Sequence, residues 1–222
     1  MTPEVGEEFC TNPKVKKISF TGSTRVGKLL MKLSSDTVKR VSLELGGNAA
    51  FIVFDDADIE QAVRAAIASK FRNAGQTCVC ADRFLIHQSV EDEFTKLLCE
   101  KIASMKIGSG MAKDTSMGPL ISASAAQNVK QKVDEAISDG AECILGGDLL
   151  PELGPNFHQP TVLRNVNTQS KIWATETFGP VVAIRTFHSE EEAIELANDT
   201  KTGLASYFCT NDMSRVFRVS SR

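Results

Sequence analysis

Strand-like and helix-like segments alternate along this 222-residue chain, and their order restricts the possible folds more than any other feature. Short apolar runs are separated by amphipathic segments long enough to cross from one strand to the next. The expected strands are 15–20, 40–46, 49–54, 83–88, 141–147, 160–165 and 180–187, and the expected helices are 23–35, 58–72, 90–105, 124–138, 190–198 and 212–222. This alternation predicts an α/β fold with a largely parallel sheet.

Composition excludes several classes of protein. The apolar content of 42% is enough for a sizeable core, and a net charge of −3 without a Lys/Arg block argues against a nucleic-acid surface. No apolar run approaches the roughly 18–20 residues of a membrane span. The first ten residues lack the basic and apolar regions of a signal peptide. We therefore expect a soluble intracellular protein with no nucleic-acid or membrane partner.

The cysteines indicate free thiols in a reducing compartment. Six of them are scattered along a chain too long to need disulfide staples. The three histidines lie far from the Cys78-x-Cys80 pair, and no Cys-x-x-Cys is present, so we expect no metal site. Burial in the core explains the cysteines other than Cys78 and Cys80.

Cys78 stands out within "FRNAGQTCVCADR", residues 71–83. Gly75 permits unusual backbone conformations, and Gln76 and Thr77 are loop formers, so the thiol is expected on a loop between a helix and a strand. Such a loop presents a thiol and nearby backbone N–H groups to a cleft, as a nucleophile requires. No Cys–His pair is visible, which disfavours a papain-like hydrolase.

Glu44, within "LELGGNAA" (43–50), is the candidate base for that thiol. It follows an alternating strand and precedes a Gly-Gly pair that a regular strand would not favour. A carboxylate at this position can be held near a site and still move. An exposed strand glutamate with no function is the alternative.

Four motifs together resemble those of the aldehyde dehydrogenase superfamily. "LELGGNAA" and "FRNAGQTCVCAD" resemble its two active-site signatures, "FTGSTRVG" (20–27) its cofactor-phosphate turn, and "ETFGP" (176–180) its nicotinamide-ribose motif. They occur in the family order, and the resemblance extends over essentially the whole chain. Through Arg72 and Cys80, the chain is most similar to the succinate-semialdehyde dehydrogenase branch.

The resemblance implies an aldehyde-dehydrogenase-like fold in two parts. Residues 1–46 would be the C-terminal part of an NAD(P)-binding domain, and residues 47–222 the thiol-bearing catalytic domain, incomplete at its C-terminus. Chains of this superfamily are much longer, so we expect the chain to be truncated at both ends. The residues that distinguish NAD from NADP would lie upstream of Met1.

The resemblance also implies a reaction, the oxidation of succinate semialdehyde to succinate in GABA catabolism. Cys78 would attack the aldehyde carbon, with the oxyanion held partly by its own backbone N–H, and a thioester would follow hydride transfer. Glu44 would activate the water that hydrolyses the thioester. The alternatives are a non-catalytic truncated isoform or fragment, and a dehydrogenase for another semialdehyde such as glutarate semialdehyde.

Cofactor contacts follow from the same likeness. Gly22, Ser23, Thr24 and Gly27 form a turn that opens a helix, where free N–H groups and the helix dipole favour a pyrophosphate. An ordinary helix cap is the alternative for this turn. Glu176 would bind the nicotinamide ribose of NAD or NADP and Phe178 would pack against it. Without the resemblance, these two residues would be interpreted as a loop charge and a core side chain.

The resemblance also implies roles in substrate specificity and in regulation for two further residues. Arg72 would bind the distal carboxylate of the semialdehyde with its forked guanidinium, although a surface arginine at a helix C-terminus is the alternative. Cys80 would form a disulfide with Cys78 on oxidation and silence the nucleophile, or else simply fill space. The resemblance also implies a homo-oligomer, a dimer or a tetramer, for the full-length protein, which would be mitochondrial if eukaryotic and cytoplasmic if bacterial.

Overall fold

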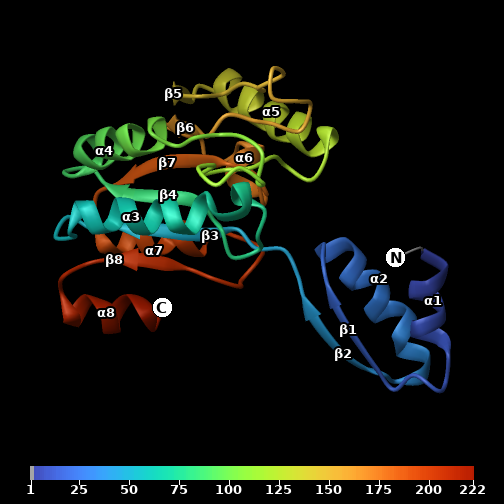
Figure 1. The fold of residues 1–222 in the computed structure, drawn as a ribbon. Coiled ribbons are helices and arrows are strands. Elements are labelled where there is room, and N and C mark those ends of the chain that lie inside the picture. The colour runs from blue at the N-terminus through green and yellow to red at the C-terminus, as the bar shows by residue number, and fades with distance from the viewer. Residues whose placement is uncertain (1–2) are drawn as a thin grey trace. The chain divides into compact units, whose positions relative to one another are not determined.

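A computed structural model describes residues 3–222 and divides the chain at its Gly-Gly pair. A smaller unit ends at Gly46, and a larger unit extends from Gly47 to Arg222. Figure 1 labels the elements of each unit.

The smaller unit is a single β–α–β arrangement with one additional helix. Its elements are α1 (Pro3–Thr11), β1 (Lys17–Thr21), α2 (Thr24–Ser34), the 3-10 turn η1 (Ser35–Thr37) and β2 (Arg40–Glu44). The two strands pair in parallel, from Lys17 opposite Arg40 to Thr21 opposite Glu44. Among residues 3–46, three apolar residues are buried, namely Cys10, Ile18 and Leu30. Helix α1 was not predicted, because Gly6 interrupts its short apolar pattern.

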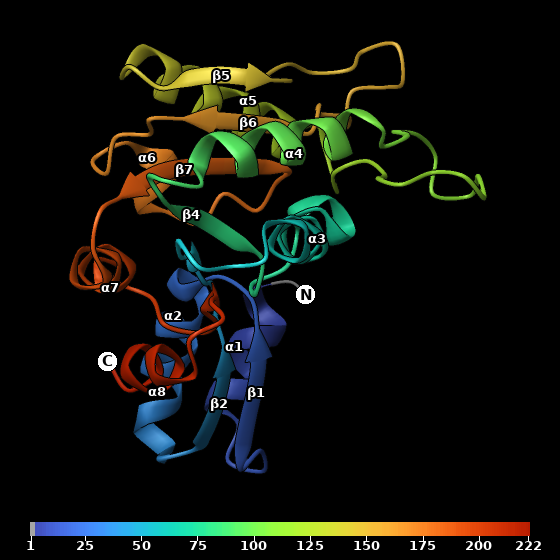
Figure 2. The ribbon, with the colours of Figure 1, turned by 90° about the vertical axis from the view of Figure 1, so that its left-hand side faces the viewer.

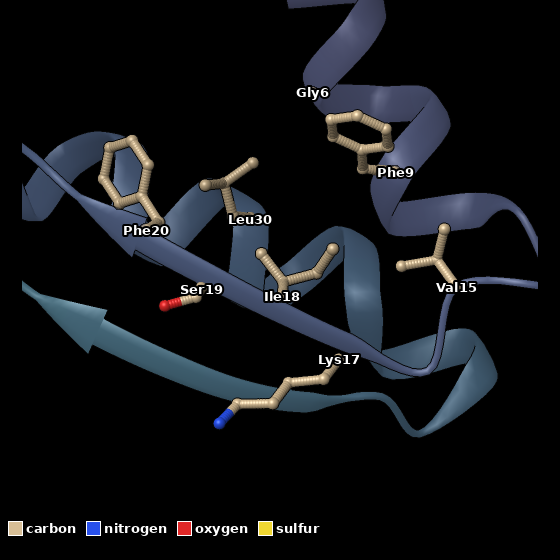
Figure 3. A pocket seen from close by; sticks show the side chains of 8 residues that line it. All are labelled: Gly6, Phe9, Val15, Lys17, Ile18, Ser19, Phe20 and Leu30. Atoms are coloured by element: carbon tan, nitrogen blue, oxygen red, sulfur yellow. The ribbon is translucent and has the colours of Figure 1, made fainter.

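A hollow of about 320 Å³ lies against β1 in the smaller unit. Figure 3 shows its lining, with Phe9 from α1, Ile18 and Phe20 from β1, and Leu30 from α2. None of the site residues predicted from the sequence lines this hollow.

The larger unit is built on a six-stranded sheet in the order β5-β6-β7-β4-β3-β8. The strands are β3 (Ala49–Val53), β4 (Ala81–His87), β5 (Glu142–Leu145), β6 (Thr161–Arg164), β7 (Val181–Phe187) and β8 (Tyr207–Cys209). Only β5 is antiparallel to its neighbour, and the other pairs are parallel. The predicted α/β fold with a largely parallel sheet is confirmed.

Helices cover both faces of this sheet. They are α3 (Ile59–Lys70), α4 (Glu91–Ala103), α5 (Ala123–Ser138), α6 (Lys171–Ala174), α7 (Glu190–Asn198) and α8 (Met213–Ser220). Figure 2 shows α3 on one side of the sheet and α7 on the other, and α4 packs against α3. All five residues of β3 are buried, because a parallel strand between two helical layers has no solvent face.

Signals in the local sequence correctly predicted most helices of the larger unit. The Asp58 carboxylate caps α3 by accepting the Gln61 N–H at 3.0 Å, as the sequence predicts. Helix α3 ends at Lys70, two residues earlier than expected, and Arg72 begins the separate 3-10 turn η2 (Arg72–Gly75). The short elements α6 and β8 were not predicted, since three or four residues carry no readable periodicity.

Charged contacts attach helix α8 to the larger unit, and Val219 also packs against its core. Arg215 reaches Asp56 at 2.6 Å and Glu190 at 3.1 Å, and its guanidinium lies 4.5 Å from the centre of the Phe54 ring. The apolar side chain of Phe217 stays exposed. Between residues 3 and 222, no helix combines the length and apolar composition that a membrane crossing requires.

Candidate functional site

The residues predicted to form the site are divided between the two units. The smaller unit holds Gly22, Ser23, Thr24, Gly27 and Glu44, and the larger unit holds Arg72, Cys78, Cys80, Glu176 and Phe178.

Cys78 lies on the loop between η2 and β4, with its side chain half-buried. The turn before it is left-handed at three successive residues, Asn73 (φ 53°), Ala74 (φ 55°) and Gly75 (φ 77°). Glycine and asparagine adopt this conformation readily but alanine rarely does, so the backbone is strained at Ala74 and needs support from its surroundings. The Gln76 side chain supplies some of it, because its Nε2 donates to Asn73 O at 2.9 Å and its Oε1 accepts the Ile121 N–H at 2.8 Å.

Glycines allow other segments to approach the thiol loop closely. A Cβ atom on Gly47 would lie 2.2 Å from the carbonyl oxygen of Cys78. A Cβ atom on Gly75 would lie 2.2 Å from the carbonyl oxygen of Gly179. The thiol loop is thus in backbone contact with the segment that follows the unit boundary and with the loop after α6.

Cys80 is buried and contacts its own loop. Its Sγ lies 2.8 Å from Thr77 Oγ1, and its backbone N–H donates to Thr77 O. Tyr207 on β8 closes the same loop by donating its hydroxyl to Val79 O at 2.7 Å. Both Cys78 and Cys80 are free thiols.

The cysteines assigned to packing have the environments of packing residues. Cys10 is buried in the smaller unit, and Cys99, Cys143 and Cys209 are partly buried in the larger one. Burial raises the pKa of the Cys209 thiol to about 11 and also raises the pKa values of Cys99 and Cys143. The thiols of Cys99, Cys143 and Cys209 therefore stay protonated at neutral pH and are poor nucleophiles.

Arg72 is exposed at the start of η2, immediately after α3. It lines a hollow of about 360 Å³ together with Phe51, Val79 and Tyr207. A guanidinium beside apolar and aromatic walls suits a short carbon chain that ends in a carboxylate.

Glu176 and Phe178 lie on the loop that follows α6. One carboxylate oxygen of Glu176 accepts the Gly47 N–H at 3.1 Å. Burial raises the pKa of this carboxyl, while the hydrogen bond from Gly47 acts in the opposite direction. Phe178 has a left-handed backbone (φ 52°) and is 43% exposed, so the alternative of a core side chain is wrong.

In the smaller unit, the predicted phosphate turn and Glu44 lie at the same end of the parallel strand pair. Ser23 is the N-cap of α2, and its Oγ accepts the Val26 N–H at 3.4 Å. The Gly22 N–H donates to Glu44 O at 3.0 Å, while the Glu44 side chain is exposed. Ligands of α/β proteins bind at the carboxyl ends of parallel strands, which is where these residues lie.

The two glycines of this turn also have a packing role. A Cβ atom on Gly22 would lie 2.5 Å from the Phe20 ring, and one on Gly27 would lie 2.5 Å from a methyl group of Leu45. Gly27 therefore lets α2 pack closely against Leu45, just after β2, and Gly22 leaves room for the Phe20 ring.

Three charged residues near Glu176 were not predicted from the sequence. Lys70 and Asp82 form a buried ion pair at 2.8 Å, and the second oxygen of Asp82 accepts the Thr177 N–H at 3.2 Å. Lys132 on α5 donates to Glu176 O at 2.6 Å. Lys132 and Glu176 are more than 40 residues apart, so only the folded chain could reveal their contact.

Arg83 anchors the segment after Gly47 and was likewise not predicted. It is fully buried on β4 and donates to the carbonyl oxygens of Asn48, Leu196 and Ala197. Asn48 in turn donates to Trp173 O at 3.0 Å, which joins this segment to α6. Among residues 3–222, no cluster of three or more potential metal ligands occurs.

Comparison with known proteins places these motifs in context. A protein named succinate-semialdehyde dehydrogenase (NADP(+)) from Saccharomyces cerevisiae is 48% identical over 219 residues, covering 99% of this chain and 44% of the relative. A glutarate-semialdehyde dehydrogenase from Pseudomonas putida is also 48% identical, covering 98% of this chain and 45% of the relative. The chain thus spans less than half the length of these relatives.

The fold has a close counterpart among solved structures. The crystal structure of a succinate-semialdehyde dehydrogenase from Burkholderia pseudomallei superposes with a TM-score of 0.97 at 48% identity. The match covers 99% of this chain and 46% of that structure. The family model described as the aldehyde dehydrogenase family matches residues 1–222. The chain therefore belongs to the aldehyde dehydrogenase family.

Proposed function

We propose that this chain is the thiol-bearing part of an NAD(P)-dependent enzyme that oxidises succinate semialdehyde to succinate. The observation that carries the proposal is the Cys78 loop, a free thiol on a strained turn with Arg72 at its start. Strain of this kind clusters at functional sites, because the surrounding structure must maintain it. The names of the yeast and Burkholderia relatives support this choice of substrate.

In the proposed reaction the Cys78 thiolate attacks the aldehyde carbon and forms a thiohemiacetal. The backbone N–H of Cys78 donates to the developing oxyanion. When bound, the nicotinamide cofactor supplies the hydride acceptor that allows the adduct to become a thioester. Glu44 then takes a proton from the water that hydrolyses the thioester, which releases succinate and restores the Cys78 thiol.

The cofactor, NAD or NADP, is assigned to residues of both units. Gly22, Ser23, Thr24 and Gly27 would hold the pyrophosphate at the N-terminus of α2. The half-buried Glu176 carboxylate would accept hydrogen bonds from the nicotinamide ribose, and the exposed Phe178 ring would pack beside it. An exposed phenylalanine held at positive φ fits a ligand contact better than a core position.

We propose a different role for each of the two units. Residues 1–46 would contribute to the NAD(P)-binding domain and residues 47–222 to the catalytic domain. The division at Gly46 supports this assignment, because it separates the phosphate turn from the thiol. By the same likeness, we expect a homo-oligomer, mitochondrial in a eukaryote and cytoplasmic in a bacterium.

Arg72 is proposed to select the substrate by its carboxylate. The Pseudomonas relative acts by name on glutarate semialdehyde, so the length of the carbon chain is a separate question. Replacing Arg72 by Lys keeps a charge but removes the fork, so KM for succinate semialdehyde should rise about tenfold or more. KM for an uncharged aldehyde of similar length should change little.

Cys80 is proposed to regulate the nucleophile. On oxidation by a peroxide, the two thiols lose their hydrogens and form a Cys78–Cys80 disulfide, while the peroxide is reduced to water. Residues two apart on a loop can reach the spacing that a disulfide needs. Loss of activity after peroxide, without the loss of two hydrogens from this peptide, would contradict the proposal.

The experiment that tests the function is reduction of NAD or NADP by the 222-residue chain supplied with succinate semialdehyde, with Cys78→Ser as the control. A rate that depends on Cys78 supports the proposal for this chain. No rate, with Cys78 still labelled by a thiol reagent, would indicate a non-catalytic product that retains the nucleophile.

A further inference from the structure

Lys132 on α5 points its ammonium group at the loop that carries Glu176. Its Nζ donates to the backbone oxygen of Glu176 at 2.6 Å and to Thr175 Oγ1 at 2.9 Å. Helices α5 and α6 pack together, so this lysine joins α5 to the end of α6 and the loop beyond.

The environment of Lys132 differs from that of Lys130, two residues earlier on the same helix. Lys130 forms ion pairs with Asp134 and Asp148. Lys132 instead gives its hydrogen bonds to neutral oxygens, and burial lowers its pKa. A partly buried cation with neutral acceptors is costly to desolvate, so its charge-assisted hydrogen bonds must be well formed.

Lys132 is one of three anchors on a very short segment. The buried Lys70–Asp82 pair holds Thr177 through its backbone N–H. The Gly47 N–H holds the Glu176 carboxylate. Lys132 holds the Glu176 carbonyl, which belongs to the same peptide bond as the Thr177 N–H that Asp82 holds.

The residue after these anchors is the strained one. Phe178 has φ 52°, a conformation that a large side chain rarely adopts. A strained backbone persists only where its neighbours over-determine it, and the three anchors supply that constraint.

We propose that Lys132 is a positioning residue that holds the Glu176 backbone, so that the Glu176 carboxylate and the Phe178 ring face the nicotinamide end of the cofactor. This inference rests on the cofactor roles proposed above for Glu176 and Phe178. Lys132 acts through the loop and does not itself touch the reacting atoms.

The first test needs no cofactor and measures amide hydrogen exchange in the 222-residue chain. Lys132→Met should speed exchange at the Thr177 and Gly47 N–H groups about tenfold, as expected when one charge-assisted hydrogen bond is lost. Lys132→Arg, which can donate to both oxygens, should restore most of the protection. Lys130→Met is the matched control and should leave both amides unchanged.

The fluorescence of Trp173, the single tryptophan, is a second probe of the same loop. It is buried in α6, three residues before Glu176. Its emission should shift in Lys132→Met but not in Lys132→Arg or Lys130→Met. Wild-type protection at Thr177 in Lys132→Met would overturn the proposal, whatever the activity of the chain.

The second test measures the dissociation constant of NADPH or NADH from its own fluorescence. Lys132→Met should weaken cofactor binding about tenfold while the rate of Cys78 labelling stays unchanged. Equal affinity in wild type and Lys132→Met would overturn the positioning role. If wild type binds neither cofactor, the function proposed for this chain fails, while the exchange at Thr177 still decides whether Lys132 orders the loop.

Discussion

The two units differ in how much apolar surface they bury. The smaller unit buries three apolar residues beneath a two-stranded sheet. The larger unit buries apolar residues from both faces of a six-stranded sheet, including Phe51, Phe84 and Trp173. Two strands alone are marginally stable in water, so the smaller unit is expected to open first. The thiol thus lies on the robust unit, and Glu44 lies on the weak one.

The largest effect is expected from the core of the larger unit. Phe84 is fully buried on β4, with its ring centre 5.2 Å from that of Phe51. Phe84→Ala should lower the free energy of unfolding by about 3–5 kcal/mol, as measured by urea titration. Phe217→Ala is the control, since its side chain is 71% exposed, and it should have almost no effect. Equal losses in both variants would contradict the core described here.

A smaller and more local effect is expected in the other unit. Leu30→Ala removes one of the three buried residues and should cost about 2 kcal/mol, near the lower end for such a substitution. Amide exchange should rise over residues 17–44 and stay unchanged over β3, β4 and β7. Leu29→Ala, at an exposed position on the same helix, should change neither region. Loss of protection in both units would show that they unfold together.

The contact between Gly47 and the thiol loop gives the next prediction. A methyl group on Gly47 would overlap the carbonyl oxygen of Cys78, so Gly47→Ala should destabilise the larger unit by about 1–3 kcal/mol. It should also change the rate at which a thiol reagent labels Cys78, because the loop must move. Gly110→Ala is the control, with no atom within 4 Å of the added methyl group. An unchanged labelling rate in Gly47→Ala would contradict the close approach.

The smallest effect is expected from the charges that hold α8. Hydrogen bonds from Arg218 and Arg215 lower the pKa of Glu190 from 4.5 to about 2. A carboxyl whose pKa is lowered by folding stabilises the fold above its unfolded pKa. The attachment of α8 should therefore be complete above pH 4.5 and weaken as the pH falls toward 2.

Amide exchange over residues 213–220, corrected for the intrinsic rate at each pH, measures this attachment. Glu190→Gln should remove most of the change in protection between pH 4.5 and 2, whereas Glu191→Gln, at a neighbouring exposed position, should preserve it. A transition of equal size in Glu190→Gln would assign it to other carboxyls, such as Asp56.

Much of the fold could be predicted from the amino-acid sequence. The apolar run 49–54 predicts a buried strand, and Asp58 predicts the start of α3, because both signals depend only on neighbouring residues. Helix α1 was missed because Gly6 interrupts its apolar pattern, and strand β8 because so short a strand carries no readable periodicity. Strand β8 is three residues long and is defined by its pairing with β3, which lies far away in the sequence.

The same distinction applies to the candidate site, where sequence motifs indicate the family but do not establish the role of each residue. Motif order along the chain led to the aldehyde dehydrogenase family, and the comparisons confirm it. The catalytic and binding roles of Cys78, Glu44, Arg72 and Glu176 remain proposals. The positions of these residues on loops and strand ends follow from local glycines and turn formers, which is why they could be anticipated.

Periodicity, caps and motifs are local properties of the chain, and they were enough to predict the α/β class, the order of the main elements and the family. Three features became visible only in the folded chain: Gly47 has no room for a side chain, Phe178 is exposed, and Lys132 reaches the Glu176 backbone. The Gly47 and Lys132 contacts depend on the close approach of segments far apart in sequence. No local pattern encodes such an approach, since packing brings those atoms together only when the whole sheet has formed.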